Sequence, residues 1–125
     1  MDVLVGRISR LLPDAELEVG LGWVEFRSGD ERGFIVRVGP EGVGIRLPTV
    51  VWQGVHMPVS SSRPWRTLDA AEPTDAVITG AIAEAMAARA AEFVACFHCG
   101  RPTPPEHRHG DTCHACAERY LGVVH

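Results

Sequence analysis

The four cysteines of this 125-residue chain all lie within its last 30 residues. They form two Cys-x-x-Cys pairs, Cys96 with Cys99 and Cys113 with Cys116, and 13 residues separate the pairs. Two residues between paired cysteines let one tight turn present both sulfur atoms, and two such turns supply the four ligands of a tetrahedral zinc site. The spacing therefore predicts one Zn²⁺ ion per chain, bound by all four thiolates.

The residues that follow each pair suit this chemistry. Gly100 comes directly after the first pair, where glycine lets the chain reverse and lets backbone amides point toward the sulfurs. Residues 117–121 are typical of a short helix that ends at Gly122, which would place Cys113 and Cys116 on its first turn. A site closed by four thiolates has no open position for a reacting water, so we expect the metal to stabilise the fold, by an amount on the order of 10 kcal/mol.

A cysteine knuckle, a short loop or hairpin and a helix that carries the second pair together resemble the treble-clef and zinc-ribbon class of small zinc modules. The resemblance covers Cys96 to about His125 and implies a structural class that is shared by proteins of many functions. A Cys-x-x-Cys pair after a long helix is also similar to the zinc finger of bacterial polymerase secondary-channel regulators. Here, however, the interval between the pairs is shorter, and a single helix cannot form their coiled-coil arm.

Other uses of the cysteines remain open: a redox pair, a rubredoxin-type iron site or two disulfides. Disulfides are disfavoured by the cytoplasmic location that we expect, because the first residues lack the charged start and apolar core of a secretory signal. His107 and His109 are alternative metal ligands near the cysteines. We interpret them as exposed loop residues beside the zinc shell.

A second candidate binding region is the segment 42–68, which contains no acidic residue. Arginine and tryptophan together can bind phosphate, carboxylate or a base, and they are also frequent anchors of protein interfaces. The alternative is that these side chains fill the core or hold the segment against the body of the protein. The candidate residues are Arg46, Trp52, His56, Arg63, Trp65 and Arg66.

The rest of the chain must position these groups, and its hydrophobic periodicity predicts an α+β fold. A helix opens the chain over residues 3–12, and strands with alternating polar and apolar residues follow. We expect strands at 15–19, 23–27, 33–38 and 43–47, a fifth at 49–55 after Pro48, and a long surface loop from His56 to Leu68. An alanine-rich helix then begins near Pro73 and is predicted to bury Ile78, Ile82, Met86 and Phe93.

These elements divide into an α+β body over residues 1–95 and a zinc-binding module over residues 96–125. The net charge of −4 argues against a protein that coats nucleic acid or an anionic membrane, and we find no stretch long and apolar enough to span a bilayer. No motif for hydrolytic or nucleotide chemistry is present. We therefore expect a non-enzymatic binding or adaptor protein with a protein partner, and self-association into a homodimer is open. The alternatives are a nucleic-acid-linked regulator and a redox or metal sensor.

Overall fold

The computed structural model describes residues 2–54, 57–69 and 73–122, and it confirms the predicted α+β class. One helix precedes an antiparallel sheet of five strands in simple sequential order, and a long helix follows the sheet. The elements of this body are α1 (Asp2–Leu11), β1 (Glu16–Gly20), β2 (Trp23–Ser28), β3 (Phe34–Gly39), β4 (Gly42–Gln53), β5 (Met57–Thr67) and α2 (Asp75–Ala91).

The last part of the chain is built from short elements around the cysteines. Two small hairpins come first, and a short helix follows them and continues as a wider π turn to Leu121. Gly122 ends this helical segment, as predicted, and has a φ of 69°, a left-handed conformation that glycine adopts readily. The elements are β6 (Val94–Ala95), β7 (Pro102–Thr103), η1 (Pro105–His107), β8 (Arg108–His109), β9 (Thr112–Cys113), α3 (His114–Cys116) and η2 (Ala117–Leu121).

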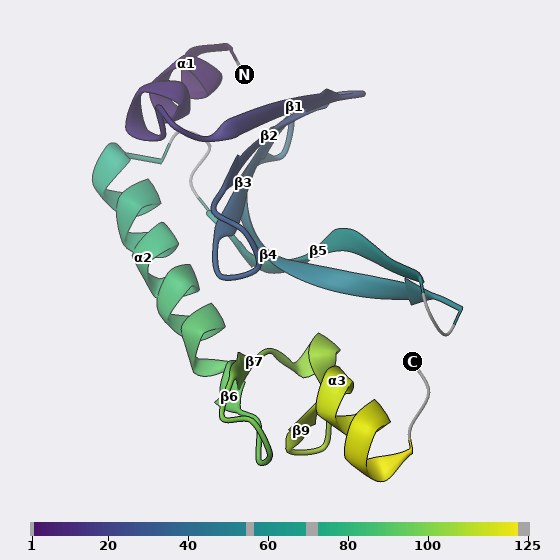
Figure 1. Ribbon diagram of the computed structural model, residues 1–125. Helices are drawn as coiled ribbons and strands as arrows, with labels where there is room; N and C mark the ends of the chain where they lie inside the picture. Colours follow the sequence, from purple (N-terminus) through teal and green to yellow (C-terminus); the bar gives the residue numbers. More distant parts are fainter. Residues whose placement is uncertain (1, 55–56, 70–72, 123–125) are drawn as a thin grey trace.

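Both long helices cover the same face of the curved sheet, whereas the β4–β5 hairpin extends beyond them over the cysteine-bearing module (Figure 1). Alternate residues of the central strands point to the helices and form the core with α1 and α2. This core contains Leu4, Ile8, Val24, Phe26, Val36, Val38, Val43, Ile45, Leu47, Ile78, Ala81, Ile82 and Ala85.

The segment between His56 and Leu68 is not the predicted surface loop. Met57–Thr67 is strand β5, which pairs with β4 along its whole length, and β4 itself runs without a break across Pro48. Pro58 and Pro64 are tolerated because β5 is an edge strand, and Pro64 lies opposite Arg46 where the register shifts. Pro48 lies on the part of β4 beyond the residues that pair with β3, so this part of β4 also has an open side. Prolines and serines predict a loop when the sequence is considered alone, but at the edge of a sheet they are compatible with strand pairing.

Helix α2 begins after Thr74, whose hydroxyl accepts a hydrogen bond from the Val77 amide at 3.2 Å. Ile78 and Ile82 are buried as predicted, but Met86 is 45% exposed and Phe93 lies beyond the end of the helix. Two alanines and one arginine complete the buried stripe, because small side chains let the helix approach the sheet closely. Its members are Ile78, Ala81, Ile82, Ala85 and Arg89.

Strand β1 forms where the alternation predicts it, but its apolar side is not covered. Leu17 and Val19 are 58% and 70% exposed, although their strand partners Phe26 and Val24 are buried. The strand lies at the edge of the sheet, and in Figure 1 it starts near α1 and extends away from both helices. In the described ranges, no helix is long and apolar enough to cross a membrane.

Candidate metal centre

The fold brings the four cysteines together. The sulfur atoms of Cys96, Cys99, Cys113 and Cys116 all lie within 4.8 Å of one another, and all four are free thiols. The first pair sits on the turn between β6 and β7, while Cys113 ends β9 and Cys116 lies on α3. The two cysteine pairs are separated along the sequence, but the fold brings them together, so all four cysteines can hold one metal ion.

Backbone hydrogen bonds fix the two turns. The Gly100 amide donates to the Cys96 carbonyl at 2.8 Å, and Gly100 has a φ of 73°, as its place after the first pair predicts. The Phe97 amide donates to the Asp111 carbonyl at 2.8 Å, which joins the first turn to the β8–β9 hairpin. The two cysteine pairs are thus held by the same backbone network.

The distances fit a tetrahedral metal better than a disulfide. A zinc ion with Zn–S bonds of about 2.3 Å separates its sulfur ligands by about 3.8 Å. The Sγ atoms of Cys99 and Cys113 are 3.8 Å apart, far beyond the sulfur–sulfur bond of about 2.05 Å in a disulfide. The donor set therefore suits one thiophilic metal ion.

The electrostatics of the site distinguish two of its thiols. Amides aimed at the sulfur, above all the Cys113 amide at 3.3 Å, lower the pKa of Cys96 to about 6. Burial and the neighbouring sulfurs raise the pKa of Cys116 to about 12. A cluster of four thiols resists full ionisation by itself, and a divalent cation offsets the repulsion among the thiolates.

Exposure is uneven across the cluster. Cys96, Cys113 and Cys116 are buried, whereas Cys99 is exposed.

In the described part of the chain, the four cysteines are the one group of three or more metal-ligating side chains that converge. His107 and His114 instead lie around the Trp52 indole, with ring centroids 6.1 and 5.3 Å from it, and neither His107 nor His109 belongs to the cysteine group.

A junction of charged groups joins this module to the body of the protein, and sequence reasoning did not find it. The Arg89 guanidinium is fully buried and binds the Glu106 carboxylate, Glu92 at 2.8 Å and the Glu31 carbonyl at 2.7 Å. The Trp52 indole donates to the Glu106 carbonyl at 3.1 Å. The only sign in the sequence is an arginine in register with the buried stripe of α2, which by itself does not reveal its partners.

The candidate residues of segment 42–68 have intramolecular contacts. Trp52 and Arg63 take part in the junction, since Arg63 pairs with Glu92. Arg66 pairs with Glu84 of α2 and lies over the Trp65 ring, while Trp65 packs against the core. Among the residues that the structure describes, Arg46 donates hydrogen bonds to Ser62, and His56 lies outside these residues. Their role as a binding surface, like the division at residue 95, stays a prediction.

We compared the chain with protein-family models, curated proteins and solved structures. No protein-family model matches the chain, and neither curated proteins nor solved structures contain a significant match.

Proposed function

We propose that this chain is a non-enzymatic, zinc-containing binding protein. In this proposal a structural Zn²⁺ ion holds residues 96–122 in shape, and that module contacts a protein partner. The observation that carries the proposal is an aromatic strip on the module surface, defined as Phe97, His98 and Tyr120.

The strip is exposed and its rings are in mutual contact. Phe97 and Tyr120 are 75% and 58% exposed. The His98 ring stacks on Tyr120 with centroids 4.9 Å apart, and Phe97 meets His98 edge-on at 5.2 Å. Exposed apolar clusters of this kind mark interaction sites, and aromatic residues are enriched at the centres of protein interfaces.

The strip also explains why a metal would be needed. Phe97 and His98 lie between the cysteines of the first pair, whereas Tyr120 lies on the helical segment after the second pair. A metal bound by all four sulfurs would fix these two parts of the chain against each other. The order of knuckle, hairpin and helix supports a treble-clef type of module, but that class hosts many functions, so the strip carries the argument.

The experiment is affinity capture with the zinc-loaded protein, followed by titration of the purified captured protein. We expect Phe97→Ser with Tyr120→Ser to weaken binding by at least tenfold, because interface aromatics commonly contribute more than about 1.4 kcal/mol. Leu21→Ser is the matched control, since Leu21 is fully exposed on the body, at the β1–β2 turn.

Other outcomes would replace the proposal. Equal binding by the strip variant and the control would remove the strip from the interface. Captured nucleic acid, lost on nuclease treatment, would favour the nucleic-acid-linked regulator. Capture of a second copy of this chain would mean that the partner is the chain itself and that the protein forms a homodimer.

A redox sensor is a second candidate function, and the exposure of Cys99 favours it. Peroxide can reach this sulfur, and its oxidation would remove one ligand and release the metal. Zinc release by dilute peroxide, reversed by a thiol reductant, would support this function. Full retention of zinc under the same treatment would remove it.

A further inference from the structure

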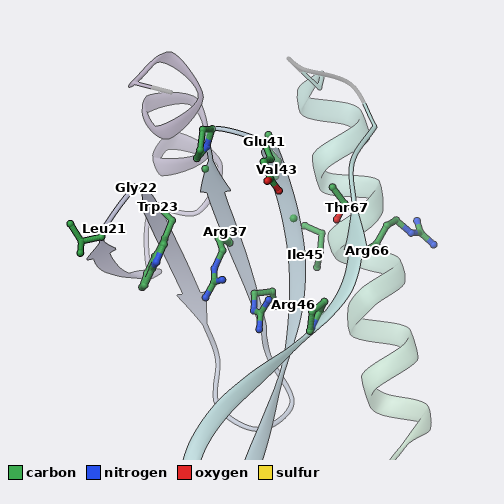
Figure 2. A pocket seen from close by; sticks show the side chains of 15 residues that line it. Leu21, Gly22, Trp23, Arg37, Glu41, Val43, Ile45, Arg46, Arg66 and Thr67 are labelled. Carbon is green, nitrogen blue, oxygen red and sulfur yellow. The ribbon is translucent and has the colours of Figure 1, made fainter.

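The helix-free face of the sheet contains a pocket that neither the metal centre nor the aromatic strip uses. Its volume is about 460 Å³, within the range of small-molecule sites, and it lies over β2, β3 and β4 (Figure 2). Trp23, Arg37 and Arg46 line it from three successive strands. The pocket therefore combines an aromatic side chain with two guanidinium groups, and its lining also includes Glu41, which Figure 2 shows at the end away from Arg46.

The register of the sheet explains why these side chains meet. Arg37 pairs with Gly44 and Ile35 pairs with Arg46, so the two arginines are diagonal neighbours on one face. Gly44 has no side chain and leaves the space beside Arg37 open. Figure 2 shows Arg37 and Arg46 next to each other, whereas Arg66 points away from them, toward its partner Glu84.

The charges in the pocket are only partly compensated. The buried Glu25 accepts a hydrogen bond from Arg37 Nε at 2.5 Å, and Ser62 accepts bonds from Arg46 Nε and Nη2 at 2.8 and 3.0 Å. In the part of the chain that the structure describes, Arg46 forms no ion pair. Burial and the charge of Arg37 lower the pKa of Arg46, so an anion placed here would relieve a repulsion.

Trp23 forms the apolar wall. Its ring lies directly over Gly20, where an added Cβ would approach the indole to 2.1 Å, and the Arg37 guanidinium is 4.8 Å from the ring centroid. The indole is thus held in place beside the guanidinium groups. An indole beside two guanidinium groups suits a ligand that has both a planar part and an oxyanion.

We propose that this pocket binds a small organic anion, with its phosphate or carboxylate group between Arg37 and Arg46 and its planar part against Trp23. The site is independent of the proposed function, because it lies on the body and involves neither the cysteines nor the aromatic strip. The chain as a whole is acidic, with a net charge of −4, so the positive charge here is local.

The test is calorimetric titration of the zinc-loaded protein at low salt with four probes. Adenosine monophosphate offers a phosphate on a planar ring system, phthalate offers carboxylates on a planar ring, adenosine lacks the anion, and inorganic phosphate lacks the ring. We expect saturable one-to-one binding of adenosine monophosphate, phthalate or both, and at least tenfold weaker binding of adenosine and inorganic phosphate. Binding of only one of the two ring anions would tell whether the group recognised is a phosphate or a carboxylate, and binding of both would mean that the pocket accepts either group.

Two variants locate the site. Arg46→Gln should weaken binding about tenfold or more, because it removes a charge-assisted hydrogen bond to the anion. Arg10→Gln removes the same charge from the exposed end of α1, and it should leave binding unchanged. Gly44→Val should fill the pocket, since an added Cβ there meets only the Arg66 carbonyl oxygen, at 3.8 Å.

We expect Gly44→Val to abolish binding while the melting temperature stays at or above that of the wild type, because valine favours strands. Binding that survives both Gly44→Val and Arg46→Gln would overturn the proposal. Absence of saturable binding by either ring anion at millimolar concentration, or equal binding of adenosine, would do the same.

Discussion

At the scale of single residues, the cysteines carry the chemistry of this chain. Three of the four sulfurs are buried, and the amides around Cys96 favour its thiolate. The spacing of the pairs was enough to predict that these side chains converge, because each pair needs only one tight turn. Neither the uneven exposure nor the divergent pKa values of Cys96 and Cys116 could be predicted, since both depend on what packs around each sulfur.

Cys116→Ser should reduce bound zinc from one ion per chain to well below one half. The change removes one of four ligands and leaves the other three unable to close a tetrahedral shell. Elemental analysis of the purified variant measures this. Ser60→Ala, an exposed position on β5, is the control and should keep full zinc content. Unchanged zinc in Cys116→Ser would show that this sulfur is not a ligand.

Arg89 is the residue on which the junction depends. Arg89→Met should lower the free energy of unfolding by about 3–5 kcal/mol, because it leaves the nearly buried Glu106 carboxylate without its cation, whereas Glu92 keeps its pairing with Arg63. Urea unfolding of the zinc-loaded protein measures the loss. Adding Glu106→Gln to Arg89→Met should cost less than the sum of the two single changes. Strict additivity would mean that the two side chains do not interact.

At the scale of elements, the sequence predicted strands and helices where one face is apolar and the other polar. This prediction failed at the edge of the sheet, where prolines and serines are compatible with a strand. β5 contains Pro58, Pro64 and three serines, yet it pairs with β4 because an edge strand needs hydrogen bonds on one side only. The buried face of α2 was predicted correctly for Ile78 and Ile82. The rest of the buried stripe consists of two alanines and an arginine, which an argument from the periodicity of large apolar residues does not select.

The start of α2 offers a direct test of local structure. Thr74→Ala should destabilise the protein by about 1 kcal/mol, because it removes the side-chain acceptor for the Val77 amide. Thr79→Ala is the matched control in the same helix. It is exposed and bonds only to carbonyls of the preceding turn, so alanine there should be neutral or slightly stabilising. Equal effects of the two changes, seen by thermal unfolding, would argue against the cap.

At the scale of the whole molecule, two parts differ in what holds them together. The body has a continuous hydrophobic core between the sheet and the two helices. The buried cluster of the module consists of Cys96, Cys113 and Cys116. A few contacts at Glu106, Trp52 and Arg89 connect the two parts. The module should therefore depend on its metal, and the body should not.

Removal of the metal with a chelator should unfold the module selectively. Hydrogen exchange followed by mass spectrometry should show loss of protection in residues 96–121, while β2, β3 and β4 keep theirs. The end of α2 near Arg89 should lose part of its protection, because Glu106 leaves its place. Cooperative unfolding of the whole chain would instead make the protein one structural unit, against the predicted division at residue 95.

The central claim is that four thiolates hold one zinc ion in each chain. Native mass spectrometry of the purified protein, with elemental analysis in parallel, measures the metal and its stoichiometry together. We expect one zinc per chain, seen as a mass above that of the reduced metal-free chain by one zinc atom less two hydrogens, because the 2+ charge of the ion replaces two protons. A mass that indicates two disulfides, iron in place of zinc, or no bound metal would contradict it.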